Sequence, residues 1–189
     1  MEINIDSYNT VIQTESDTYT LMEGTDADEI LVGNSFNNTI VGKGGSDVLI
    51  YKVLDQASHL GGNGQDIWTD FKLGTVYTDN TQLDSVNVIS SDEADAIDIS
   101  DLLDGGADLT NIGEYISVKY DKASDTAIIS VDRDGSKSEY QKTELLTLKG
   151  VQDSSTKQLE QLEQLKEGDQ DLTSSEYGDK FLQLLINNN

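Results

Sequence analysis

The stretch GTDADEILVGNSFNNTIVGKGGSDVLI (24–50) divides into three units of nine residues that follow one another without a gap. Each unit begins with glycine, ends with an apolar or β-branched triplet, and carries an acidic or amide residue at its sixth position: Glu29, Asn38 and Asp47. A fourth unit, GGNGQDIWT (61–69), fits the pattern G-G-x-G-x-D-x-U-x at every fixed position. This repeat is the clearest organisation in the chain.

Each unit predicts one tight turn followed by one short strand. Glycine tolerates backbone conformations that other residues resist, and a short apolar run forms a strand. Successive units of this kind wind into a parallel β-solenoid. One carboxylate per turn, together with carbonyls of the glycine loop, supplies the six to eight oxygen ligands that calcium prefers. The alternative is a set of glycine-rich hairpin turns with exposed acids.

Composition favours a cation as the partner. The chain has 189 residues, enough for one domain or two small ones, with 36 acidic residues against 12 basic ones and a net charge of -24. Nucleic acids and anionic membrane surfaces are therefore poor partners. With only 35% hydrophobic residues, such a chain tends toward disorder unless its charge is neutralised, as a divalent metal would do. It contains no cysteine, which excludes disulfides and thiolate metal sites.

The sequence has no conventional targeting or spanning segment. The first ten residues, MEINIDSYNT, lack the basic and apolar regions of a signal peptide, and no stretch has the length of a transmembrane helix. We therefore expect no membrane insertion, and an exported protein would use another signal.

Residues 24–71 resemble the calcium-binding β-roll of RTX proteins. In that family two nonapeptides make one turn of the roll, and calcium lies between loops one turn apart. The resemblance implies that loop 24–29 faces loop 42–47, and that loop 42–47 faces loop 61–66. The ligands that it implies are the side chains of Glu29, Asp47 and Asp66 and the carbonyls of Gly42, Gly44, Gly61 and Asn63, with Asp28 as a substitute in the first loop.

One or two calcium sites, centred on Asp47 and Asp66, are expected from this resemblance. The chain departs from the family pattern at several places. Lys43 replaces a glycine of the family, and Glu29 and Asn38 replace aspartate. YKVLDQASHL (51–60) interrupts the register with a stretch that lacks glycine. Trp68 and Phe71, at the end of the repeats, are expected in the core.

Beyond Phe71 the nine-residue period disappears, and three β-type runs follow: YISVKY (115–120), TAIISVD (126–132) and TELLTLKG (143–150). They predict an antiparallel meander. In the turn DRDGS, Asp132 and Asp134 resemble half of an EF-hand loop and are further candidate metal ligands, although hairpin chemistry explains them more simply.

The C-terminal part of the chain predicts two amphipathic helices. In 154–167, SSTKQLEQLEQLKE, the leucines are spaced three apart. In the following segment Thr173 and Glu176 form a capping box before an apolar stripe. The expected fold is therefore mainly β: a short parallel β-roll (24–71) after lead-in strands (1–23), continued by a β-rich capping region with an antiparallel β meander (72–151), and C-terminal α-helices (152–189).

A second resemblance covers roughly 24–189. The order DIWTDF, DAIDISDLL, ISVD, LTLKGV and a leucine-rich acidic tail is similar to the C-terminal target domain of type I secretion substrates, especially giant repeat adhesins of Gram-negative bacteria. It implies a calcium-binding secretion signal module of an extracellular or cell-surface adhesin, unfolded in the cytosol and folding on calcium after export. The implied partners are an ABC transporter and its export channel, and a monomer is expected.

Other functions remain as alternatives. The same tail ends RTX toxins and secreted hydrolases, whose active domains lie upstream. An enzyme within this chain is not expected, because His59 is the sole histidine and no G-x-S-x-G or H-E-x-x-H motif occurs. His59 is expected to be an exposed loop residue. No sequence feature indicates a specific pocket for sugars or host surfaces.

Overall fold

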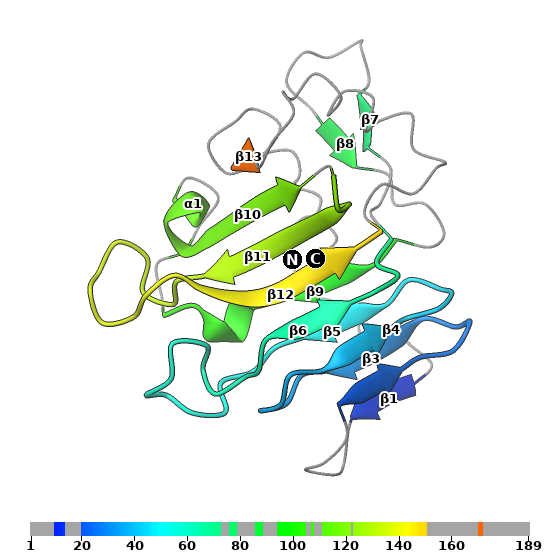
Figure 1. The fold of residues 1–189 in the computed structure, drawn as a ribbon, viewed down its shortest axis with the longest axis horizontal. Helices are drawn as coiled ribbons and strands as arrows, with labels where there is room; N and C mark the ends of the chain where they lie inside the picture. The colour runs from blue at the N-terminus through cyan, green and yellow to red at the C-terminus, as the bar shows by residue number, and fades with distance from the viewer. Residues whose placement is uncertain are drawn as a thin grey trace.

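The structure is a computed structural model that describes residues 10–13, 20–72, 76–78, 86–88, 94–104, 107, 111–121, 123–150 and 170–171. Strands make up most of its regular structure (Figure 1). In chain order the elements are β1 (Thr10–Gln13), β2 (Leu21–Glu23), β3 (Glu29–Val32), β4 (Thr39–Val41), β5 (Val48–Ile50), β6 (Asp66–Trp68), β7 (Val76–Thr78), β8 (Val86–Val88), β9 (Ala96–Asp98), the 3-10 helix η2 (Ser100–Leu102), α1 (Ile112–Tyr115), β10 (Ile116–Asp121), β11 (Thr126–Val131), β12 (Thr143–Lys149) and β13 (Gln170–Asp171).

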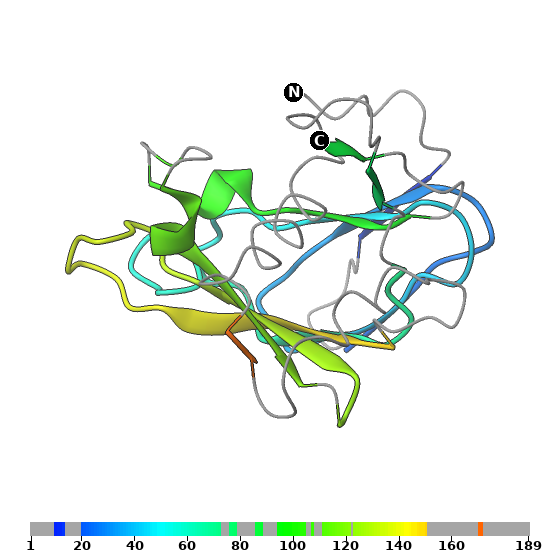
Figure 2. The ribbon, with the colours of Figure 1, turned by 90° about the horizontal axis from the view of Figure 1, so that it is seen from above.

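Consecutive strands from β1 to β6 alternate between two sheets. β1, β3, β5 and the later β9 form a parallel sheet of four strands. β2, β4 and β6 are parallel neighbours at one end of a sheet of seven strands in the order β13-β10-β11-β12-β6-β4-β2. Figure 2 shows the sheets as two layers. β3 and β5 pair at an offset of 18 residues, with Leu31 beside Leu49, and β2 and β4 pair at the same offset, with Met22 beside Ile40.

The core lies between the two layers and consists of side chains stacked in register. In the four-stranded sheet the stack is Leu31, Leu49 and Ile97, and in the larger sheet it is Met22, Ile40, Trp68 and Leu148. All seven are buried because each points to the face of its strand that is turned toward the other layer. Trp68 and Phe71 are buried as predicted, with their rings edge to face and 5.1 Å between centroids.

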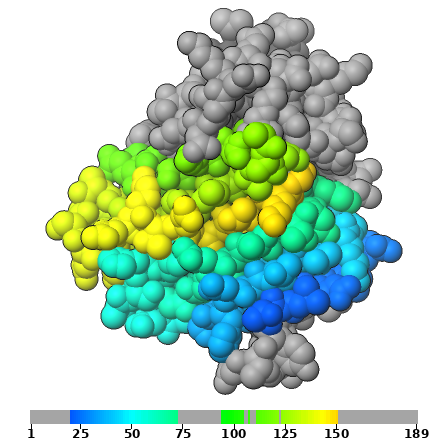
Figure 3. All heavy atoms as spheres, in the orientation of Figure 1, coloured from blue at the N-terminus to red at the C-terminus, as the bar shows by residue number. Residues whose placement is uncertain are grey.

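The predicted meander follows the repeats. β10, β11 and β12 pair antiparallel in sequence, close to the three expected ranges. β12 also pairs parallel with β6, so Leu148 lies beside Trp68 and the meander extends the same sheet as the repeats. Figure 3 shows this continuity as neighbouring bands of blue, cyan and yellow atoms across one face.

One expected stacking is wrong. Loop 42–47 does face loop 24–29, since Gly44 N–H donates to Thr25 O (3.1 Å), but it does not face loop 61–66. β6 pairs with β4, at an offset of 28 residues, and β5 pairs with β9. The physical reason is that residues 51–60 form a loop without a strand. β6 is therefore the next strand after β5 and enters the opposite sheet, which places loop 61–66 against loop 33–38.

The predicted mainly β character is confirmed, and the expected lead-in region contains β1 and β2. The predicted helices at 154–167 and after Thr173 lie outside the described residues. Within the described ranges, no helix is long and apolar enough to cross a membrane.

Candidate cation-binding loops

Four repeat loops stack in two pairs at the ends of the strands. The first loop pair consists of 24–29 and 42–47, and the second of 33–38 and 61–66. The first pair brings together Asp28, Glu29, Gly42, Gly44 and Asp47, and the second holds Gly61, Asn63 and Asp66.

One hydrogen bond recurs at three acids that lie at the start of a strand. Asp47 Oδ1 accepts the backbone N–H of Glu29 at 3.0 Å, and Asp95 Oδ1 accepts the N–H of Asp47 at 3.1 Å. In the other sheet, Asp66 Oδ1 accepts the N–H of Asn38 at 2.7 Å. Each carboxylate thus binds the equivalent residue at the start of the neighbouring strand. The acids hold adjacent parallel strands together as well as being candidate ligands.

In the first loop pair, oxygen atoms converge on the space that Gly24 leaves open. A Cβ placed on Gly24 would lie 2.5 Å from Gly42 O and 2.7 Å from Glu29 Oε2. The Glu29 carboxylate also accepts the backbone N–H of Thr25 (2.9 Å) and its hydroxyl. Asp28 Oδ1 accepts the N–H of Ser46 at 2.8 Å. This loop pair therefore already uses several carboxylate oxygens to order its own backbone.

In the second loop pair, the buried side-chain oxygen of Asn63 has no hydrogen bond. Asn63 donates through Nδ2 to Lys52 O and Leu60 O, both at 2.8 Å, but its buried Oδ1 has no hydrogen-bond partner. That oxygen is 3.4 Å from where a Cβ on Gly33 would lie. Burying an acceptor without a partner is costly, so Asn63 Oδ1 fits the role of a ligand oxygen.

The other two predicted residues of this loop have partners. Asp66 Oδ2 accepts the hydroxyl of Tyr51 at 2.7 Å. Gly61 O accepts the backbone N–H groups of Leu54 (2.6 Å) and Asp55 (2.7 Å), which ties this carbonyl to the loop 51–60.

Burial disfavours the ionised form of three of these carboxyls. It raises the pKa of Asp47 to about 8, with repulsion from Asp95 as the second cause, and the N–H of Glu29 offsets part of the rise. Burial likewise raises the pKa of Asp95 to about 7 and that of Asp66 to about 6, although backbone N–H donors lower both. Near neutral pH, burial therefore favours the protonated form of Asp47 most strongly, and a nearby positive charge would stabilise the ionised form of all three.

The weaker candidates lie in the connection between β11 and β12. Asp134 accepts the backbone N–H groups of Glu139 (3.0 Å) and Tyr140 (3.3 Å), which orders the turn. Asp132 is buried and its Oδ1 has no hydrogen-bond partner. Burial is the largest cause of the raised pKa of Asp132, followed by its hydrogen bond with Asp134. Asp134 therefore orders the turn as in a hairpin connection, and Asp132 leaves one carboxylate oxygen without a hydrogen bond.

Sequence reasoning missed two acids that bind the first loop pair. Asp70 accepts the N–H groups of Gly42 (2.9 Å) and Lys43 (2.8 Å), and Asp95 accepts that of Lys72 (2.7 Å) as well as that of Asp47. Asp95 carried a usable signal, because it directly precedes a strand as Asp47 does. Asp70 follows its strand and had no comparable signal.

Among the described residues, no three acidic or histidine side chains gather into a ligand group for a metal. A cation in these loops would therefore need amide and carbonyl oxygens beside the carboxylates. The sole histidine, His59, is exposed as expected, and its Nδ1 accepts the N–H of Gln141 at 3.1 Å.

Compared with models of known protein families and with curated proteins, the chain shows no match. Its function has to be inferred from its own repeats and from the geometry of these loops.

Proposed function

We propose that the chain is the C-terminal calcium-binding and type I secretion signal module of a large extracellular RTX adhesin of a Gram-negative bacterium. The module is unfolded in the cytosol and folds on binding calcium after export. Its partners are an inner-membrane ABC transporter and the export channel, and it acts at the cell surface or in the medium without enzymatic activity of its own.

The observation that carries this proposal is the alternation of β1 to β6 between two sheets. β3 and β5, like β2 and β4, pair parallel at an offset of 18 residues, and a glycine-containing loop precedes each of the strands β3 to β6. This arrangement supports a short β-roll, because two units then complete one coil. The acidic or amide residue at the sixth position of each unit lies at the start of its strand, where the β-roll of the family would hold calcium.

The residues of both loop pairs fit calcium on the chemistry of their donors. In the second pair, the unpartnered Asn63 Oδ1 and the carboxylate of Asp66 would hold the ion. In the first pair, Asp47, Glu29 and Gly42 O would do so, with Asp28 and Gly44 in the same loops. Burial removes these carboxylates from water and so disfavours their ionised form. A bound calcium ion supplies a positive charge that stabilises the ionised form. Asp132 is a further, weaker candidate because of its unpartnered Oδ1.

Charge explains why folding would wait for export. A chain with a net charge of -24 repels itself, and buried carboxyls with raised pKa values oppose folding at neutral pH. Extracellular calcium modules typically bind with dissociation constants of about 10⁻⁴ to 10⁻³ M. At a free concentration ten times the dissociation constant, each site stabilises the folded state by about 1.4 kcal/mol. Two sites are decisive for a domain of marginal stability.

The export step rests on residues 152–189, which the sequence places after the meander and most of which lie outside the described residues. Its test is a fusion of a small passenger protein to the N-terminus of residues 1–189 in a Gram-negative host with a type I adhesin exporter. We expect the passenger in the medium only when the transporter is active and 152–189 are present. Passenger retained in cells with an active transporter, or released equally without 152–189, would contradict the export role.

A further inference from the structure

Arg133 is the sole arginine of the chain, and its side chain is completely buried. In a protein with 36 acidic residues, the one guanidinium is thus removed from the surface where it would offset charge. Burying a guanidinium is costly unless hydrogen bonds satisfy it, so its surroundings show what the burial achieves.

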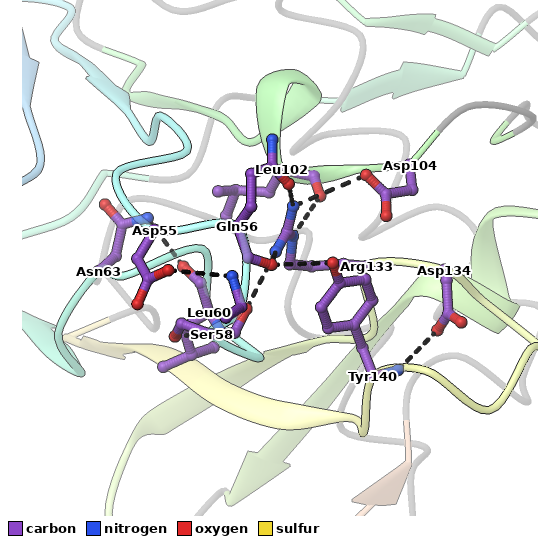
Figure 4. Close-up of polar contacts among 11 residues, drawn as sticks. Asp55, Gln56, Ser58, Leu60, Asn63, Leu102, Asp104, Arg133, Asp134 and Tyr140 are labelled. Atoms are coloured by element: carbon purple, nitrogen blue, oxygen red, sulfur yellow. Dashed lines mark hydrogen bonds and ion pairs between the residues drawn. The ribbon is translucent and has the colours of Figure 1, made fainter.

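The guanidinium binds two segments far from it in sequence (Figure 4). Nε donates to Leu102 O at 3.0 Å. Nη1 donates to Gln56 O (3.1 Å) and Ser58 O (3.0 Å), and Nη2 donates to Gln56 Oε1 at 2.9 Å. Asp104 Oδ1 lies 3.6 Å from Nη2. Most of its contacts are therefore with residues 51–60, the segment that interrupts the repeats.

The turn that carries Arg133 adds its own contacts to the same segment. The Tyr140 ring lies under the guanidinium, 4.4 Å from Cζ to the centroid, and the Tyr140 hydroxyl donates to Gln56 O at 2.9 Å. Gln141 N–H donates to His59 Nδ1. Gln56 O thus accepts hydrogen bonds from both Arg133 and Tyr140, and the connection between β11 and β12 clamps the loop 51–60.

This clamp reaches the second loop pair through one further hydrogen bond. Ser58 O, which accepts from Arg133, also accepts the N–H of Gly61 at 3.0 Å. Leu60 O, two residues on, accepts from Asn63 Nδ2 and so directs the unpartnered Oδ1 of the same amide. Loop 51–60 is therefore the link between Arg133 and the candidate ligand Asn63.

We propose that Arg133 is a positioning residue: through loop 51–60 it holds the loop Gly61–Asp66 in its cation-binding conformation and couples this site to the meander. The inference rests on the proposed calcium function. By linkage, calcium at Asp66 also orders the turn 132–141, which contributes no ligand to that site.

Arg133→Met, which keeps much of the volume but removes the donors, is the central variant. Arg133→Lys keeps the charge without the fork of donors, and Tyr140→Phe removes only the hydroxyl. Lys142→Met is the matched control, since Lys142 lies in the same connection but its Nζ donates to Gly113 O. Two quantities are measured for each variant. The first is hydrogen exchange of residues 52–61 and 134–141. The second is the midpoint of a calcium titration followed by Trp68 fluorescence.

Arg133→Met should raise the rate of hydrogen exchange in both segments. It should also raise the calcium concentration at the midpoint by about tenfold to 100-fold, as loss of a supporting residue does at other metal sites. The same substitution in an Asp66→Asn background should leave the midpoint of that variant unchanged, because the two residues act on one site. Arg133→Lys and Tyr140→Phe should give smaller shifts, and Lys142→Met none.

Equal shifts for Arg133→Met and Lys142→Met, or an undiminished effect of Arg133→Met in the Asp66→Asn background, would overturn the positioning role. If calcium has no effect on the wild-type chain, the proposed function fails and the cation-site part of this inference fails with it. In that case the chain is folded without calcium, and hydrogen exchange under this condition tests the clamp by itself: unchanged exchange in Arg133→Met would show that Arg133 does not hold loop 51–60.

Discussion

Asp47 Oδ1 accepts the backbone N–H of Glu29, 18 residues earlier in the chain, at 3.0 Å. The same bond joins Asp95 to Asp47 and Asp66 to Asn38. At these three places a side chain therefore links neighbouring parallel strands where they begin, and each carboxylate that does so is buried. The same carboxylate orders the backbone through its hydrogen bond. When it is ionised and no cation is near, its burial lowers the stability of the folded state.

The stability of the calcium-free chain should fall as pH rises. The pKa values of Asp47 (about 8), Asp95 (about 7) and Asp66 (about 6) in the folded state exceed the ordinary value of 3.8. The folded state therefore binds more protons than the unfolded state between pH 4 and 8. Within its own window each group lowers the free energy of unfolding by about 1.4 kcal/mol per pH unit.

Circular dichroism in chelator should accordingly show more folded protein at pH 5 than at pH 8. Asp95→Asn keeps an oxygen acceptor for Asp47 N–H but cannot ionise, so its pH dependence should be shallower. A free energy of unfolding that increases from pH 5 to 8 in chelator would refute the sign of this effect.

Gly45→Ala should be strongly destabilising. Gly45 has a φ of +89°, and a Cβ there would lie 2.5 Å from the backbone C and O of Ala27 in the facing loop. Strain and overpacking together should cost about 2 to 4 kcal/mol, measured by denaturant unfolding at saturating calcium. Gly113→Ala is the control, because a Cβ there meets nothing within 4 Å, and a change below about 0.5 kcal/mol is expected. Similar losses for both variants would argue against the stacking of the first loop pair.

Lys43→Gly should stabilise the chain. Lys43 stands where the repeat family has glycine, and its φ of 73° lies in the left-handed region that favours glycine. Relief of this strain should add about 0.5 to 1 kcal/mol to the free energy of unfolding. The ion pair of Lys43 with Glu23 (3.0 Å) is half exposed and should offset little of the gain. Lys43→Ala loses the ion pair and keeps the strain, so a gain in Lys43→Ala as well would contradict this explanation.

The sequence was most informative where one physical pattern recurs. The apolar triplets predicted β3, β4 and β5 because the period of nine places glycine turns and buried side chains at fixed intervals. The three runs that begin at residue 115 also predicted β10 to β12. Here the recurring pattern is alternation of apolar and polar residues, which marks a strand with one buried face.

Two features were beyond sequence reasoning because they depend on distant contacts. The partner of loop 61–66 depended on whether residues 51–60 contain a strand, and spacing alone suggested the wrong partner, loop 42–47. The role of Arg133 depends on residues 75 and 77 positions away, which no local pattern reveals. The role of Asp95 could have been predicted, because it lies directly before a short apolar strand, as Asp47 does.

The most direct test of the account is a calcium titration of the purified chain, followed by Trp68 fluorescence and far-ultraviolet circular dichroism, with magnesium as the control ion. Trp68 is buried and lies two residues after Asp66, so it reports on the second loop pair. We predict a calcium-selective gain of β structure at about 10⁻⁴ to 10⁻³ M, weakened in Asp47→Asn and Asp66→Asn. A chain that is already folded in chelator at neutral pH and unchanged by calcium would contradict the account and leave the nonapeptides as structural turns.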